Sequence, residues 1–372
     1  MLVEESRHPM PTLPELLRIA VERGASDLHM VADRPPTLRI AQELVPAVAE
    51  PLTAAEVAAA AQALLPAHLR ERFHTQREAD FSHMEPGVGR FRVNVFLATG
   101  TYAISLRHVK DRVPSFEELH LPPQIQSLAM FPRGIVLAAG TTGCGKSTTL
   151  AAIIEHINAH LVRRIVTIED PIEYLFQPKR SLISQREVGI DTQSFHAALK
   201  HVLRQDPDVI MIGEMRDAES FVAALSAAQT GHLVFSTLHT GTASQAIPRI
   251  LDFFPATERD SIRMALADNL RAVFCQRLVP ASDGGVRPAV EILISTPTVR
   301  KLIEQNRLDK LPAAIETGTE DGMQTFNQSL YALIRAGAVT EEVALRYASN
   351  PEALRMNLKG VFLDEARRIL TS

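Results

Sequence analysis

Residues 134–147 read GIVLAAGTTGCGKS, a short apolar run followed by a glycine-rich loop. The loop at 140–147 matches the pattern G-x-x-x-x-G-K-[ST], and the residues after it are typical of a helix. A buried strand, a glycine-rich loop and a helix in this order predict a phosphate-binding unit at the edge of a sheet. Glycines let successive backbone N–H groups turn toward one anion, and the helix N-terminus adds partial positive charge.

The chemistry predicted for this loop is the binding of ATP together with Mg²⁺. Lys146 is expected to reach the β and γ phosphates, and Ser147 is expected to ligate the metal ion. Further contacts to the nucleotide are expected from the rest of the loop and the first helical turn, which are Gly140, Thr141, Thr142, Gly143, Cys144, Gly145 and Thr148.

More apolar runs follow the loop, separated by segments long enough for helices. They are RRIVTI, DVIMIG, HLVFSTL and AVEILI. This pattern is typical of buried strands joined by crossover connections, so residues 124–372 are predicted to form an α/β domain. From about Thr298 onward the chain is expected to be helical, with Thr340 capping a helix that begins with Glu341 and Glu342.

Residues 1–112 are predicted to form a separate α+β domain. A helix is expected after Thr12, and Thr53 with Glu56 forms a capping-box pattern ahead of an alanine-rich helix. Strands are expected in SDLHMV, TLRIAQELV, RFRVNVF and TYAISLRHV. The segment at 113–123 is rich in proline and lacks apolar periodicity, which predicts a linker.

Composition excludes several classes of protein. The 372 residues are 46% hydrophobic and 22% charged, which suits a globular chain of two domains. The net charge of −4 disfavours nucleic-acid binding, and the absence of an NKxD motif disfavours a guanine-nucleotide switch. Cys144 and Cys275 have no neighbour at metal or redox spacing. No apolar run reaches membrane length and the first residues lack a signal-peptide pattern, so a cytoplasmic location is expected.

Acidic residues follow two of the predicted strands. Glu214 ends DVIMIGE, and Glu169, Asp170 and Glu173 follow RRIVTI. Strand-end carboxylates beside a phosphate loop can hold Mg²⁺ or activate water, and Glu214 is the first candidate for the general base. The open alternative for each acid is a solvated strand end or a helix cap.

Two histidines, His232 and His239, flank the predicted strand in TGHLVFSTLHT. Their N–H groups could contact the γ phosphate of a bound nucleotide. The open alternative is an ordinary core or surface histidine.

Taken in order along nearly the whole chain, these motifs resemble those of the secretion ATPases, and most closely the type IV pilus retraction ATPases of the PilT and PilU type. Besides the loop at 140–147, the resemblance rests on GASDLH at 24–29, GRFRVNVF at 89–96, IEDPIEY at 168–174, REVGIDT at 186–192, LRQDPDVIMIGEMRD at 203–217, TGHLVFSTLHT at 230–240, TPTVRKLIE at 296–304 and GMQTFNQSLY at 322–331. Thr141 and Cys144 depart from the proline and serine that are usual in the family's loop.

The resemblance implies an N-terminal PAS-like domain joined to a RecA-like ATPase domain, with homohexamers that bind ATP between subunits. It also implies that Glu173 belongs to an acidic "Asp box", that Glu214 is the general base at the end of Walker B, and that His232 and His239 form the "His box". Arginines of the N-terminal domain reach phosphate in a neighbouring subunit in this family, and the matching positions are Arg90, Arg92 and Arg107. Surface ion pairs are the open alternative for these arginines.

The function that the resemblance implies is a motor that retracts pili while docked on an inner-membrane platform protein. A paralogous retraction ATPase is a further candidate partner. The protein is then expected at the cytoplasmic face of the inner membrane, held there through the pilus machine. A pilus-assembly or type II secretion ATPase and a non-hydrolysing regulatory subunit are the alternatives. Retraction is favoured because assembly motors of the family carry a further N-terminal domain and a tetracysteine zinc module, for which this sequence has no room.

Overall fold

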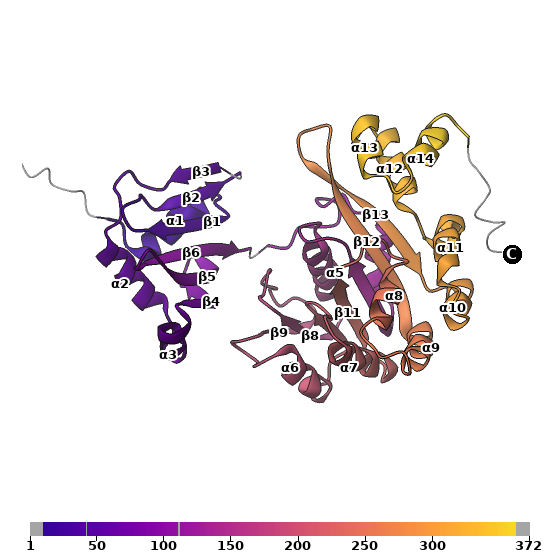
Figure 1. The fold of residues 1–372 in the computed structure, drawn as a ribbon, viewed down its shortest axis with the longest axis horizontal. Coiled ribbons are helices and arrows are strands. Elements are labelled where there is room, and N and C mark those ends of the chain that lie inside the picture. Colours follow the sequence, from indigo (N-terminus) through magenta and orange to yellow (C-terminus); the bar gives the residue numbers. More distant parts are fainter. Residues whose placement is uncertain (1–9, 42, 111, 362–372) are drawn as a thin grey trace, which may run out of the picture. The chain divides into compact units, whose positions relative to one another are not determined.

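The computed structural model describes residues 10–41, 43–110 and 112–361, which form two compact units, each built on its own β-sheet (Figure 1). The first unit comprises Met1–Arg112 together with Pro171–Leu175. The second comprises Val113–Asp170 and Phe176–Ser372.

The first unit is an antiparallel sheet with the strand order β3-β2-β1-β6-β5-β4, accompanied by three helices. Its elements are α1 (Leu13–Glu22), β1 (Asp27–Val31), β2 (Thr37–Ile40), β3 (Glu43–Pro46), α2 (Ala54–Leu64), α3 (Ala67–Gln76), β4 (Glu78–Glu85), β5 (Gly89–Ala98) and β6 (Thr101–Val109). The buried side chains of these elements make one apolar core, with Leu16, Leu28 and Phe91 at its centre.

Helix caps and apolar patterns in the sequence predict most of the helices and strands of this unit. Thr12 and Thr53 each form a capping box with the glutamate three residues later, which confirms the predicted helix starts. The sequence did not predict α3 and β4. In α3 only Phe73 is buried, so this helix carries almost no apolar periodicity to detect.

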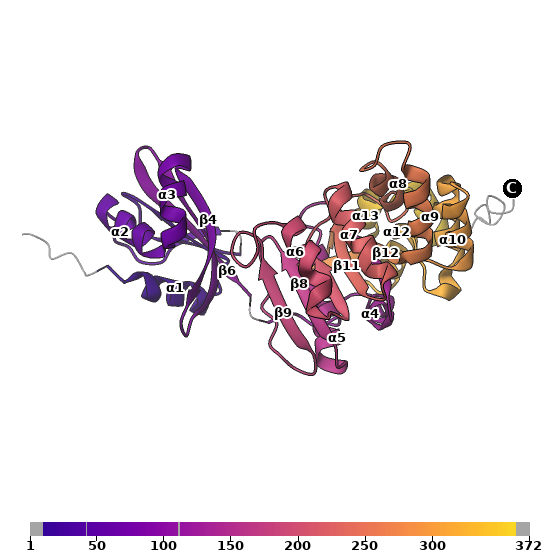
Figure 2. The same cartoon turned by 90° about the horizontal axis from the view of Figure 1, so that it is seen from below.

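The second unit is a seven-stranded sheet with the order β13-β12-β7-β11-β10-β8-β9. Its parallel strands include β7 (Gly134–Ala139), β8 (Arg164–Glu169), β9 (Leu182–Glu187), β10 (Val209–Ile212) and β11 (Leu233–Leu238), with β9 at one edge of the sheet. Helix α5 (Lys146–His160) covers one face, and α6 (Phe195–Val202) and α7 (Ala218–Gln229) cover the other (Figure 2). Every residue of β7 and β11 is buried, as expected for parallel strands covered on both faces.

A long hairpin extends this sheet beside β7. It consists of β12 (Leu270–Pro280), which is parallel to β7, and β13 (Val286–Ile294), which is antiparallel to β12. The apolar run of β13 was predicted as a strand, whereas β9 and β12 were not. The remaining helices are α4 (Pro123–Ser127), α8 (Ala246–Leu251), α9 (Arg259–Asn269), α10 (Pro297–Glu304), α11 (Leu311–Thr317), α12 (Phe326–Arg335), α13 (Glu341–Tyr347) and α14 (Pro351–Leu358), and short 3₁₀ turns lie at Leu128–Met130, Leu203–Gln205, Leu308–Lys310 and Thr319–Asp321.

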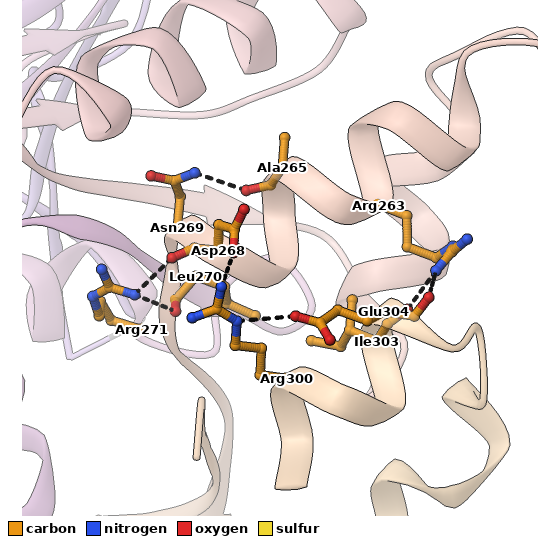
Figure 3. Close-up of polar contacts among 9 residues, drawn as sticks. All are labelled: Arg263, Ala265, Asp268, Asn269, Leu270, Arg271, Arg300, Ile303 and Glu304. Atoms are coloured by element: carbon orange, nitrogen blue, oxygen red, sulfur yellow. Dashed lines mark hydrogen bonds and ion pairs between the residues drawn. The ribbon is translucent and has the colours of Figure 1, made fainter. Parts of the chain in front are cut away.

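The C-terminal helices confirm the predicted helical region, and Thr340 accepts a hydrogen bond from the Val343 N–H at the start of α13. Polar contacts join α9 to α10 (Figure 3). Arg263 donates to the carbonyl oxygens of Ile303 and Glu304 at the end of α10, and Arg300 forms ion pairs with Asp268 and Glu304. In the part of the chain that the structure describes, no helix combines the length and the apolar character needed to cross a bilayer.

The fold is therefore a RecA-like α/β domain together with an N-terminal α+β domain of the PAS-like kind, as the sequence predicted. The glycine-rich loop follows β7, near the middle of the second sheet.

Candidate functional site

The glycine-rich loop connects the end of β7 to the start of α5. Gly145 is the N-cap residue of α5 and has φ 91°, a left-handed conformation that glycine adopts without a steric penalty. The orphan N–H groups of the first helical turn therefore face the loop, and they are the natural donors for an anion.

Lys146 lies inside this loop. Its side chain is 8% exposed, and Nζ donates to the carbonyl oxygens of Gly140 (2.8 Å) and Thr141 (2.9 Å). The Cys144 thiol is buried and lies 4.0 Å from Nζ. Lys146 therefore places a cation at the centre of the loop, while Thr141, Thr142, Gly143 and Ser147 are exposed around it.

Gly140 leaves no room for a side chain. It has φ 138°, and a Cβ atom there would lie 2.5 Å from the Cys144 Sγ and 2.8 Å from the Gln276 carbonyl oxygen. The first glycine of the motif thus serves close packing of the loop against β12.

We expect Gly140→Ala to lower the free energy of unfolding of the second unit by about 2–3 kcal/mol, because strain at a positive φ adds to the steric overlap. Gly284→Ala is the matched control, since Gly284 also has a positive φ but no atom within 4 Å of the added Cβ. Its expected cost is about 1 kcal/mol. Urea titrations of both variants measure the difference, and equal shifts would contradict the packing role.

Glu214 and His239 meet at the same edge of the sheet. Glu214 follows β10 and His239 follows β11, and parallel strands place their carboxyl ends together. The His239 Nε2 lies 3.2 Å from the Glu214 Oε1, and the Arg216 guanidinium lies 2.8 Å from Oε2. The carboxylate side chain keeps 21% of its surface exposed, so it is held between two basic groups and remains accessible to water.

Arg216 is a neighbour of this carboxylate that the sequence reasoning missed. The hydrogen bond that Arg216 donates to Glu214, together with the negative charge of that carboxylate, raises the pKa of the Arg216 guanidinium, and Asp170 contributes in the same direction. The signal was present in GEMRD, where an arginine stands two residues after the acid, but spacing alone does not show that the two side chains turn toward one another.

The three acids that follow RRIVTI, which are Glu169, Asp170 and Glu173, lie in different surroundings in the structure. Glu169 ends β8 and is buried, and its carboxylate accepts hydrogen bonds from Thr167 Oγ1 (2.6 Å) and Gln185 Nε2 (3.2 Å). Asp170 is exposed and lies close enough to Arg216 to influence its pKa. Glu173 is exposed and groups with the first unit.

Among the described residues, no three acidic, histidine or cysteine side chains form a metal site. A magnesium ion bound with a nucleotide needs fewer protein ligands, because phosphate oxygens and water complete its octahedral shell. The oxygen donors of this site fit a magnesium ion that is bound together with a nucleotide. Ser147 presents an exposed hydroxyl at the start of α5, and carboxylates follow the neighbouring parallel strands.

His232 lies at the other edge of the sheet. Its carbonyl accepts from the Gly134 N–H at the start of β7, and its ring contacts the Ala227 carbonyl and the Thr230 hydroxyl. A strand of this length spans about 20 Å, so the structure brings His239, and not His232, to the edge where the phosphate loop of the same chain lies. A nucleotide-binding role for His232 stays a prediction.

The predicted arginines share one face of the first sheet. Arg90 and Arg92 lie two residues apart on β5, and Arg107 on β6 stands directly opposite Arg92. Arg107 forms an ion pair with Asp27 (2.8 Å), and Arg92 is exposed. The charge of Arg107 is therefore balanced by Asp27, and a phosphate-binding role for the three arginines stays a prediction.

Comparisons with known proteins show the family to which the chain belongs. The family model described as "Type II/IV secretion system protein" matches residues 8–350. The type IV pilus ATPase PilU of Pseudomonas aeruginosa is 41% identical over 346 residues, which cover 93% of this chain and 91% of that protein. The type IV pilus retraction ATPase PilT of the same organism is 41% identical over 340 residues, covering 91% and 99%.

A solved structure shows the same fold. The crystal structure of the pilus retraction motor PilT with bound ADP superposes with a TM-score of 0.86 at 40% identity, and the likeness covers 92% of this chain and 98% of that one. The likeness therefore extends over both units.

Proposed function

The chain belongs to the type II/IV secretion system protein family, and from this premise we propose that it is an ATPase that drives the retraction of type IV pili. The observation that carries the proposal is the sheet edge where the loop around Lys146 follows β7 and the Glu214–His239 pair follows β10 and β11. The near full-length likeness to retraction ATPases supports the direction of the motor.

We assign the chemistry to the residues as follows. The loop N–H groups and Lys146 bind the β and γ phosphates and offset the charge that develops during transfer. Ser147 would hold Mg²⁺ together with a carboxylate from the acids that follow β8 (Glu169, Asp170 and Glu173), and the bound ion would supply Lewis-acid stabilisation of the phosphate oxygens. Glu214 orients a water molecule and accepts its proton.

His239 and Arg216 position the base in this account. The Arg216 guanidinium and the His239 ring each contact one carboxylate oxygen of Glu214, so both oxygens are held in position. The ATP then loses its γ phosphate to the activated water, and the products are ADP and phosphate.

We propose that residues 1–112 act as the PAS-like domain, joined by 113–123 to the ATPase domain at 124–372. In a homohexamer, Arg90, Arg92 and Arg107 of one subunit would reach the phosphates bound by the next. The ring would work at the cytoplasmic face of the inner membrane against a platform protein of the pilus machine, with a paralogous ATPase as a further partner, and it would not need nucleic acid.

A mixing experiment tests the shared active site. We expect Arg92→Ala and Lys146→Ala rings to be inactive when measured separately, because each lacks one part of every site. Mixed rings should recover ATPase activity, since an intact loop on one subunit meets an intact arginine on its neighbour. Native mass spectrometry with Mg·ATP should report hexamers in all samples. Mixed hexamers with no recovered activity would contradict action in trans.

A further inference from the structure

Three consecutive residues of β12 contact both loops of the proposed site. Successive side chains on a strand point to opposite faces, so Gln276 faces one way, and Cys275 and Arg277 face the other. Gln276 reaches the phosphate loop, and its two neighbours reach the segment after His239, which we call the His239 loop (residues 239–243).

Gln276 is buried, with 3% of its surface exposed, and both ends of its amide form hydrogen bonds. Nε2 donates to the Cys144 carbonyl (2.8 Å), and Oε1 accepts from the Thr149 hydroxyl (2.9 Å). One amide group therefore ties the middle of the phosphate loop to the first turn of α5. A Cβ on Gly145 would lie 2.7 Å from Nε2, so the loop is packed directly on this side chain.

Arg277 holds the His239 loop. Nη2 donates to the Gly241 carbonyl (3.2 Å) and Nη1 to the Tyr347 carbonyl (2.6 Å) at the end of α13. The guanidinium stacks on the Phe326 ring of α12, 3.8 Å from its centroid. The planar fork thus connects the His239 loop to two C-terminal helices.

Two neighbours fix the same loop. The Cys275 thiol contacts the Thr240 carbonyl (3.5 Å), and burial raises its pKa to about 12, so it stays a thiol donor. The buried Glu291 carboxylate on β13 accepts from the Ala243 N–H (2.7 Å). His239 is therefore followed by a segment held at three successive points by the β12–β13 hairpin.

We propose that Gln276 is a positioning residue for ATP binding and that Arg277 is a separate positioning residue for the hydrolytic step. Gln276 acts through the loop that holds the phosphates, so its loss weakens nucleotide affinity. Arg277 acts through the His239 loop on the Glu214–His239 pair, which the proposed function uses only when water attacks. The inference rests on the proposed ATPase function, and it assigns different roles to two adjacent residues of β12.

The test separates affinity from turnover with two conservative variants. Gln276→Glu keeps the acceptor for Thr149 but loses the donor to the Cys144 carbonyl, so the Kd of a non-hydrolysable ATP analogue should rise about tenfold, with kcat at saturating ATP changed less than about threefold. The Kd should also rise with pH, because a protonated carboxyl can still donate. Arg277→Lys replaces a planar fork by a single ammonium, so kcat should fall about tenfold while Kd stays within about twofold.

Asn269→Leu is the matched control, since Asn269 Nδ2 donates to the Ala265 carbonyl within α9, ahead of the start of β12 and away from both loops. It should leave Kd and kcat near their wild-type values, and unfolding midpoints report whether each variant is folded. Parallel changes of Kd and kcat in both β12 variants, or no change in either, overturn the proposal. A wild-type protein that binds the analogue but does not hydrolyse ATP refutes the proposed function and the Arg277 role, whereas the Kd of Gln276→Glu still decides the Gln276 role.

Discussion

Lys146→Ala is expected to raise the Kd of ATP about 100-fold or more and to abolish measurable hydrolysis, because the loop loses the cation placed among its carbonyl groups. Isothermal titration calorimetry and a phosphate-release assay measure the two effects. The fold should persist, since removing Lys146 removes a buried charge together with its two hydrogen bonds.

Lys359→Ala provides the control for charge alone, because Lys359 is exposed and lies at the end of α14. It should bind and hydrolyse ATP like the wild type. Nucleotide affinity retained by Lys146→Ala would remove the phosphate loop from the mechanism.

Glu214→Gln is expected to retain ATP and to lose hydrolysis by a factor of about 10²–10⁴, the usual contribution of a general base. The amide can still hydrogen-bond to water but cannot take its proton. Stability should change little, because the partners in both ion pairs are exposed, with 68% of the Arg216 side chain and 44% of the His239 side chain accessible.

Glu219→Gln is the matched control, since Glu219 forms an exposed ion pair with His196 (2.9 Å) on the same domain. Single-turnover kinetics of both variants separate the chemical step from product release. If Glu214→Gln hydrolyses ATP at the wild-type rate, the general base is instead one of the acids that follow β8.

The phosphate loop could be predicted from sequence because all of its parts are local. Strand, loop and helix follow each other within one short stretch, and the spacing of glycines and Lys146 restricts what the backbone can do there. The capped helices after Thr53 and Thr340 were predictable for the same reason, since a cap is a contact between residues three apart.

Contacts between distant segments were not predictable. Glu214 and His239 are joined through the pairing of β10 with β11, and a single sequence carries no record of strand order. Gln276 was missed because β12 was not recognised as a strand, although its register beside β7 is what brings the amide to the loop. His232 shows the converse case, because the strand that the two histidines were predicted to flank places them at its opposite ends.

The arrangement of the three arginines of the first unit could be predicted only in part. The sequence predicted the strand that carries Arg90 and Arg92, but only the pairing of β5 with β6 places Arg107 opposite Arg92. Whether that face meets a nucleotide is a property of the assembled ring, which the mixing experiment addresses.

The central claim is that ATP hydrolysis by this protein withdraws pili, and the most direct measurement follows labelled pili on living cells. In a strain without the protein, we expect pili to be present but not to retract, with twitching motility lost. The wild-type gene should restore retraction, and Glu214→Gln at equal abundance should not. Pili absent from the deletion strain and restored by the wild type would identify an extension motor, and retraction restored by Glu214→Gln would contradict the account.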